Sequence, residues 1–269
     1  MIRVELDKAA RRWRTWLLAA ALAGVPCLIA VAVKASPPTP GDVGDDAPPF
    51  LLQIVRNGLF VPLTGLAVVQ PLFLSLAVGL FAGDAIAGEA QGGTLRSLLV
   101  RPVERPRLIG SKYASAIVLL AAMLLAVVVA GLLAGGVLFG FAPLPTLSGS
   151  TLSIPETIVR IGGAALYILL AAFGVTAIGI FVSTLTDSGP GAVIATVVLT
   201  IGSQVLDQIP SLSGVHPFLP THGWLGYADL FRFPVEWGTI RGGLIVSVAY
   251  AIVFLGAALV WFNRKDVTA

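Results

Sequence analysis

The chain has 269 residues, of which 57% are hydrophobic and 12% are charged. Soluble domains carry about 25% charged residues, so this composition excludes a soluble domain and predicts a polytopic helical membrane protein. The net charge of +3 does not indicate nucleic-acid binding, because the basic residues are concentrated on particular segments. The single cysteine, Cys27, excludes an intrachain disulfide framework.

Residues 1–16 read MIRVELDKAARRWRTW and predict a basic amphipathic helix. Apolar residues recur at helical spacing, and basic residues fill most of the remaining positions. Such a helix lies in the membrane interface, where Arg11, Arg12 and Trp13 are the candidate contact residues. An elbow helix that touches a soluble partner and a plain orientation anchor both fit this pattern.

Six apolar segments are long enough to cross a bilayer. They are residues 17–33, 59–82, 113–141, 161–185, 191–206 and 242–262. The third is rich in small residues, among them Gly131, Gly135 and Gly136, which suits close helix packing. No Asp, Glu, Lys, Arg or His lies deep in any span, which argues against a proton-driven carrier and against a channel with a charged filter.

The longest polar interruption between these segments is residues 84–112. Asp84 is a good N-cap for a helix that begins directly after it, since its carboxylate can accept free N–H groups of the first turn. The pair Gly92-Gly93 interrupts that helix, and Thr94 then caps a second short helix. These two helices lie at the membrane surface and serve either a soluble partner or orientation alone.

Residues 207–241 form the longest later connection. Aromatic residues mixed with prolines at this density suit short helices that lie in the interface or dip into it. His216 and His222 are candidate metal ligands, with Asp229 and Glu236 as helpers. No cysteine or further histidine is near them in the sequence, so we expect no metal site.

The distribution of Lys and Arg predicts the topology. With six spans, the two ends of the chain, residues 84–112 and the turn at 186–190 lie on one side. That side carries twelve basic residues against five on the other, so both termini are expected in the cytoplasm.

Two sequence features argue against an enzyme. No G-x-x-x-x-G-K-[ST] motif occurs, so the chain does not bind and hydrolyse ATP by that device. Neither histidine lies in a span where it could activate a serine, and no pair of intramembrane aspartates is present, which argues against an intramembrane protease.

An ordered set of short motifs follows the second span. It comprises Asp84, Gly88-Glu89, Gly92-Gly93-Thr94-Leu95, Leu98-Leu99, Arg101-Pro102-Val103, Arg105 and Gly110-Ser111-Lys112. Together with the basic N-terminal helix, the six-span plan and the ending Phe262-Asn263-Arg264-Lys265-Asp266, this order resembles the permease subunit of ABC-2 type transporters, the bacterial relatives of the ABCG exporters. The resemblance covers nearly the whole chain, so residues 1–269 are expected to form one ABC-2 type transmembrane domain.

The resemblance implies a fold class and a set of partners. The fold is all-α, with six transmembrane helices, the N-terminal interfacial helix, a cytoplasmic coupling helix between spans two and three, and short re-entrant helices at the extracellular side within residues 207–241. The coupling helix would rest in a groove of a separate ATP-binding cassette ATPase, and the N-terminal helix would touch the same subunit. The residues expected at the ATPase are Asp84, Glu89, Thr94, Arg96, Arg101 and Arg105. In an alternative interpretation, Arg96, Arg101 and Arg105 hold lipid phosphates.

Further partners follow from the same resemblance. A second permease, identical or not, would complete a dimer in a bacterial inner membrane, in contact with membrane lipid. ATP and magnesium would belong to the ATPase, and this chain would hold no cofactor. Polar residues of spans two and five either line the cargo path or satisfy helix backbone, and they are Thr64, Gln70, Ser75, Ser203 and Gln204.

The resemblance implies an exporter permease for a hydrophobic or amphipathic small molecule, such as a drug, an antibiotic or a lipid. An alternative is a membrane subunit whose ATPase does mechanical or maturation work on a periplasmic partner, as in copper-site assembly. A secondary carrier is a weaker third alternative.

Overall fold

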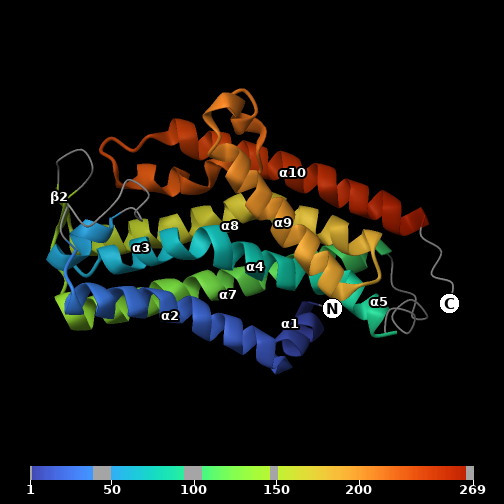
Figure 1. Ribbon diagram of the computed structural model, residues 1–269, viewed down its shortest axis with the longest axis horizontal. Helices are drawn as coiled ribbons and strands as arrows, with labels where there is room; N and C mark the ends of the chain where they lie inside the picture. The colour runs from blue at the N-terminus through green and yellow to red at the C-terminus, as the bar shows by residue number, and fades with distance from the viewer. Residues whose placement is uncertain (1, 39–49, 94–104, 146–150, 265–269) are drawn as a thin grey trace.

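The computed structural model describes residues 2–38, 50–93, 105–145 and 151–264. Within them, six helices are long and apolar enough to cross a membrane (Figure 1). These are α2 (Trp13–Ala35), the composite helix Phe60–Gln91, α7 (Arg105–Phe139), α8 (Ile154–Leu185), α9 (Gly189–Asp207) and α10 (Trp237–Arg264). The expected all-α, six-span fold is confirmed.

The bundle has two distinct ends (Figure 1). At one, which we call the α1 end, the short helix α1 (Ile2–Arg11) packs against α7, and α10 ends on the far side of the bundle from α1. At the other, the hairpin end, α10 begins and strands β1 (Leu144–Pro145) and β2 (Thr151–Leu152) pair antiparallel. Each strand has only two residues, so the pair leaves the all-α class unchanged.

The N-terminal helix is shorter than the predicted range 1–16. Arg12 has extended backbone angles, φ −85° and ψ 121°, and separates α1 from α2. Trp13 and Trp16 therefore belong to the first spanning helix, where both rings are largely exposed. The amphipathic pattern continues across Arg12, which explains why the sequence alone does not reveal the break.

The second spanning helix is one continuous helix with two π-helical interruptions. Its parts are α3 (Phe60–Val69), the π-helical η2 (Gln70–Leu74), α4 (Ser75–Val78), the π-helical η3 (Gly79–Gly83) and α5 (Asp84–Gln91). The helix ends at Gly92-Gly93, as expected, and Gly93 has a φ of +68° that favours glycine.

One expectation about the segment after the second span is wrong, and another falls on residues that the structure does not describe. Asp84 is not an N-cap, because Gly83 and Asp84 both have right-handed helical backbone and the helix runs through them without a side-chain cap. The second short helix, with Thr94, Arg96 and Arg101, lies outside the described residues.

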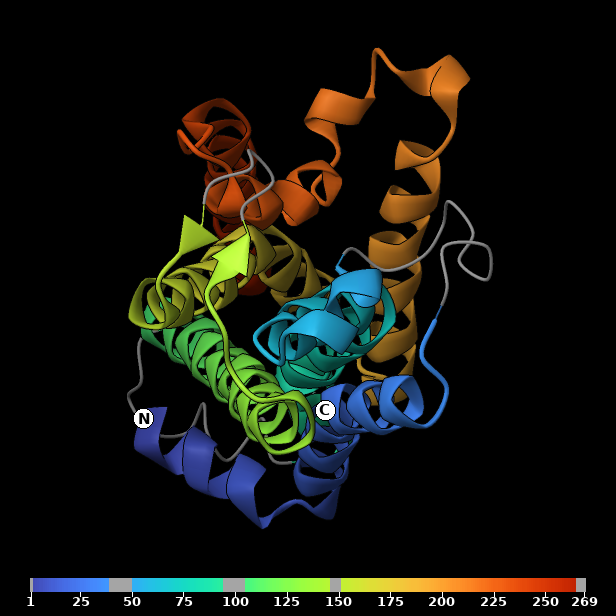
Figure 2. The ribbon, with the colours of Figure 1, turned by 90° about the vertical axis from the view of Figure 1, so that its left-hand side faces the viewer.

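The composite helix and α8 form the centre of the bundle. In each, 61% of the most apolar window is buried, against 17–39% for the other four spans. Viewed along the bundle, the composite helix lies in the middle with α2, α7 and α9 around it (Figure 2). Small residues permit α7 to approach the composite helix closely, since a Cβ on Gly131 of α7 would lie 2.6 Å from the Pro62 Cα.

Short 3₁₀ helices fill the connections. One precedes the second span and three lie between α9 and α10. They are η1 (Leu51–Arg56), η4 (Pro210–Leu212), η5 (His216–Phe218) and η6 (His222–Phe231). Short helices are thus present within residues 207–241, and their re-entry into a membrane stays a prediction.

Candidate functional site

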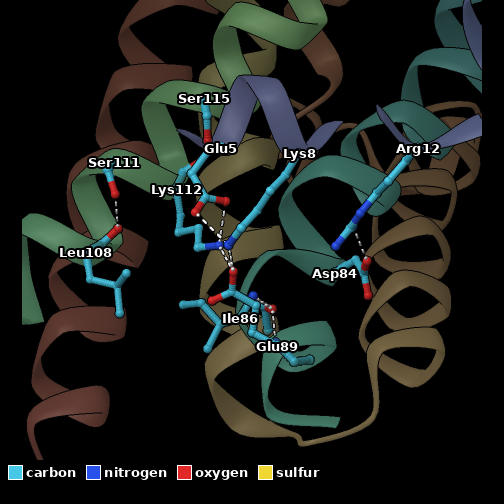
Figure 3. A network of polar contacts seen from close by, with 12 residues as sticks. Glu5, Lys8, Arg12, Asp84, Ile86, Glu89, Leu108, Ser111, Lys112 and Ser115 are labelled. Atoms are coloured by element: carbon cyan, nitrogen blue, oxygen red, sulfur yellow. Dashed lines mark hydrogen bonds and ion pairs between the residues drawn. The ribbon is translucent and has the colours of Figure 1, made fainter. Parts of the chain in front are cut away.

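Three elements that are far apart in the sequence meet through charged side chains at the α1 end (Figure 3). The Lys112 ammonium group, on α7, donates to Glu89 Oε1 on α5 at 2.5 Å and to Glu5 Oε2 on α1 at 2.6 Å. Lys8 on α1 donates to the same Glu89 oxygen at 3.1 Å and lies 3.5 Å from Glu5 Oε1. We call these four residues the charge cluster.

The charge cluster is largely removed from solvent. The Lys112 and Glu89 side chains are 4% and 8% exposed, whereas Lys8 is 42% exposed. A buried ion is costly unless it is paired, so two carboxylates and two ammonium groups balance each other here. The cluster therefore ties α1, α5 and α7 into one unit whose members depend on one another.

Helical spacing brings the α1 residues to one face. Glu5 and Lys8 are three positions apart on α1, so their side chains lie on the same face of that helix, and Arg12 follows directly after α1 ends. Lys112 lies in the helix α7, which begins eight residues earlier than the predicted span. Charged residues can thus meet beyond the apolar parts of the spans.

Lys8 stays protonated in this setting. Partial burial lowers its pKa, but the Coulomb attraction and hydrogen bonds of Glu89 and Glu5 outweigh that effect. The net result raises the pKa of Lys8 above its ordinary value of 10.5.

A second ion pair lies beside the charge cluster. Arg12 donates to Asp84 Oδ2 at 3.2 Å (Figure 3). The other Asp84 oxygen lies against the start of α9, since a Cβ on Gly189 would be 2.4 Å from Asp84 Oδ1. A carboxylate near a helix N-terminus is favourable, so Asp84 links α5 to α2 and α9 instead of capping its own helix.

Hydrogen bonds hold α5 from the opposite side. The backbone N–H groups of Ile86 and Ala87 both donate to Ser183 Oγ of α8, each at 2.9 Å. They follow directly after η3, where the π-helical turn disturbs the regular ladder of backbone bonds. Gln91 Oε1 accepts the Gly189 N–H at 2.9 Å and joins the end of α5 to α9.

Arg105 contacts the end of α10 in the same chain. Its guanidinium donates to the carbonyls of Phe262 at 2.6 Å and Asn263 at 3.0 Å, and lies over the Phe262 ring. These are last-turn carbonyls of α10, which a basic side chain commonly satisfies. Arg105 thus joins the start of α7 to the end of α10, and its contact with an ATPase or a lipid phosphate stays a prediction.

The candidate residues of the N-terminal helix differ in their surroundings. Arg12 pairs with Asp84, as described above, while Arg11 is exposed at the end of α1. Trp13 is 69% exposed in the first turn of α2. Their contact with lipid or a partner stays a prediction.

The polar residues of spans two and five satisfy helix backbone and one another. Gln204 donates to the Pro71 carbonyl at 3.0 Å and to Ser75 Oγ at 3.2 Å. Gln70 donates to the Trp224 carbonyl at 2.8 Å.

The two remaining polar residues are also buried. Ser203 exchanges a hydrogen bond of 2.7 Å with Thr221, and Thr64 is fully buried. These contacts are compatible with the packing role, and the lining of a cargo path stays a prediction.

The two histidines come together around Asp207, which the sequence did not single out. His222 Nδ1 lies 2.6 Å from Asp207 Oδ1, and His216 Nδ1 lies 3.9 Å from it. Among the described residues, no three His, Cys, Asp or Glu side chains are arranged to hold a metal ion.

The proposed helper residues lie elsewhere. Asp229 pairs with Arg232 at 2.8 Å, and Glu236 lies 3.8 Å from the same guanidinium. Neither is a neighbour of the histidine pair in these contacts, so the absence of a metal site stays an expectation.

Sequence reasoning assigned no contacts to Glu5, Lys8 and Lys112. One signal was available for Lys112, because an ammonium group at the start of an apolar run must find a partner when the helix packs. Its partners lie 23 and 107 positions away, and no local pattern identifies them.

A family model described as an ABC-2 family transporter protein matches residues 1–203. The match spans well over half of the chain and contains the whole charge cluster, but it ends before η4, η5, η6 and α10. No curated protein matches the sequence closely enough to count as a relative. The chain therefore belongs to the ABC-2 family of transporter membrane proteins, as the order of residues around Glu89 predicts.

Proposed function

We propose that this chain is the permease subunit of an ATP-driven exporter, and that α5 receives the movement of a separate ATP-binding cassette ATPase. The observation that carries this proposal is the way α5 is held. Ion pairs join it to α1, α2 and α7, and hydrogen bonds join it to α8 and α9. An element held on all sides moves only with its neighbours.

The mechanism follows from this attachment. ATP binding closes the ATPase dimer and pushes on the exposed end of α5 at Gln91, Gly92 and Gly93. Because the paired charges of Glu89 cannot separate without a large desolvation cost, α1 and α7 follow α5 as a rigid body. A second permease, related by approximate symmetry, moves in the same way and opens the path between the two.

The cargo class follows from what the spans contain. In the described spanning helices, Asp, Glu, Lys and Arg residues lie only towards the helix ends, for example Lys34, Asp84 and Arg160. A hydrophobic or amphipathic molecule can cross such an interior without a charged relay. The α1 end faces the cytoplasm in this proposal, in line with the bias of Lys and Arg.

Affinity purification of the tagged chain from its native membrane, followed by mass spectrometry, tests the partner. We expect an ATPase with a Walker motif at near-equal amounts. A matched pair of variants tests where it binds. Lys8→Gln weakens the cluster beside α5 and should reduce recovery of the ATPase, whereas Lys34→Gln removes one positive charge at the hairpin end and should not.

Recovery of the folded chain without any nucleotide-binding protein would overturn the exporter proposal. ATPase activity of the complex in nanodiscs, measured with hydrophobic compounds, then tests the cargo. Stimulation supports export, while its absence together with a co-purified periplasmic protein would favour the maturation alternative.

A further inference from the structure

A cavity of about 410 Å³ lies in the half of the bundle towards the hairpin end. The first turns of α10 form one wall, and the segment from η5 into η6 forms the other. Its size falls within the range of about 300–1,000 Å³ that is typical of small-molecule sites. All of its lining residues except Ala171 of α8 lie beyond residue 203, outside the part of the chain that the family model matches.

The chemistry of the lining selects a neutral and largely apolar ligand. Among the described residues, no Asp, Glu, Lys or Arg lines the cavity, and apolar residues such as Pro217, Leu219 and Ile245 provide much of the wall. The polar side chains in the lining are His222, Trp224 and Thr239. A charged ligand would lose its hydration here without gaining an ionic partner, so the cavity disfavours it.

His222 supplies a defined polar group. Its Nδ1 lies 2.6 Å from Asp207 Oδ1, and a carboxylate only accepts, so the Nδ1 position carries the proton of the imidazole. In the neutral form of the ring, Nε2 is an acceptor, and no hydrogen bond joins this atom to the described residues. A ligand hydroxyl is the donor that suits it.

One wall of the cavity is tightly packed, and another has open space beside its backbone. Gly223 and Gly243 are packed together, since a Cβ on Gly223 would lie 2.5 Å from the Gly243 Cα. Tyr167 of α8 donates to the Gly223 carbonyl at 2.5 Å and fixes this contact. Gly242 also lines the cavity, but a Cβ placed there would meet no atom within 4 Å.

We propose that this cavity binds a neutral amphiphile, in which an apolar body contacts the α10 wall and a hydroxyl group donates to His222 Nε2. This inference rests on the proposed export function, because it names the class of cargo that the permease would hold near its exit. It adds a chemical requirement, an uncharged ligand with a hydroxyl donor, that export alone does not impose.

Photolabelling of the purified chain, without any ATPase, tests the inference. The probe is a diazirine derivative of dodecanol, and the chain is held in phosphatidylcholine nanodiscs. We expect labelled peptides from residues 217–224 and 239–246, and competition by dodecanol but not by dodecylamine or dodecanoate. Labelling spread evenly over the lipid-exposed helices, or equal competition by the charged analogues, would overturn the proposal.

Two variants with matched controls sharpen the assay. Gly242→Leu fills the cavity and should lower labelling by about tenfold or more. Gly256→Leu adds the same side chain to α10 in open space away from the lining, and should leave labelling unchanged. Equal labelling of the two folded variants would contradict the inference.

His222→Phe removes the acceptor and should weaken competition by dodecanol about tenfold, which is the effect of one ordinary hydrogen bond. His216→Phe removes the other ring near Asp207 but not a lining residue, and should have no such effect. Because the ATPase is absent, failure of labelling refutes the cavity proposal alone, and failure of the purification described above refutes the export function alone.

Discussion

Two regions of the bundle, the charge cluster and the cavity beside α10, are built on opposite physical principles. At the α1 end, paired charges leave a pocket of only about 60 Å³ among α1, α5 and α7. Towards the hairpin end, an uncharged lining surrounds about 410 Å³. Charges that satisfy one another close the first region and make it suitable for passing on movement, while the neutral space of the second is suitable for holding a molecule.

The largest expected effect tests whether the α1 end depends on its charges. Lys112→Met leaves the Glu89 and Glu5 carboxylates buried with too little positive charge, so it should destabilise the chain by about 3–5 kcal/mol in reversible unfolding from mixed micelles. The double variant Glu89→Leu/Lys112→Met keeps Glu5 beside Lys8 and should recover most of that loss. A single variant as stable as the parent would remove the contrast between the two ends.

A smaller effect tests the attachment of α5 to α8. Ser183→Ala removes the acceptor of the Ile86 and Ala87 N–H groups, which should cost about 1–3 kcal/mol. Hydrogen exchange measured by mass spectrometry should then speed up at these two amides. Ser111→Ala is the control, because Ser111 only donates to the Leu108 carbonyl within its own helix, and unchanged exchange in both variants would contradict the role of Ser183.

The exposed ion pair of Arg12 with Asp84 should contribute less to stability than the charge cluster. Arg12 is 57% exposed, so Arg12→Gln should change the stability of the chain by no more than about 1 kcal/mol. Thermal unfolding at low and high salt measures this, and salt should reduce the difference. A loss of stability as large as that of Lys112→Met would show that the exposed Arg12 pair and the buried charge cluster contribute equally to stability.

The smallest effect concerns pH. The pKa of Lys8 is raised above 10.5 in the folded chain, so its stabilising contribution is fully present below about pH 10.5 and disappears as pH rises through the higher folded value. The difference in thermal stability between the parent and Lys8→Met should therefore stay constant from about pH 7 to pH 10 and shrink above that. A difference that shrinks below about pH 9 would exclude the pairing of Lys8 with Glu89 and Glu5.

The six spans could be predicted from sequence because each is an apolar run long enough to cross the bilayer. Their true ends could not, since polar residues continue a helix as well as apolar ones do, as at the starts of α7 and α8. The helical nature of the segment around Glu89 and its end at Gly92 were also predictable. The N-cap at Asp84 was wrong because the helix does not begin there.

The partners of Glu89 could not be predicted for a different reason. Lys8 and Lys112 lie on separate helices, and the face that α5 turns towards them depends on the two π-helical turns before it. A π-helical turn leaves no signature in hydropathy or spacing. The cluster could not be predicted because its residues are far apart in the sequence and because the change in helix rotation at the π-helical turns cannot be read from the sequence.

The π-helical segment η3 has a consequence for how this fold can change over time. One residue of an α-helix corresponds to about 100° of rotation around its axis and 1.5 Å of rise. A π-helical turn holds one residue more than the α-helical turn it replaces, so loss of one codon within Gly79–Gly83 that restores the ordinary winding would leave Asp84 and Glu89 facing the same neighbours. Loss of one codon in an α-helical part of the same helix would instead swing both residues by roughly that angle. The π-helical turn thus gives this transmembrane helix one position where a residue can be lost without redirecting the contact face of α5.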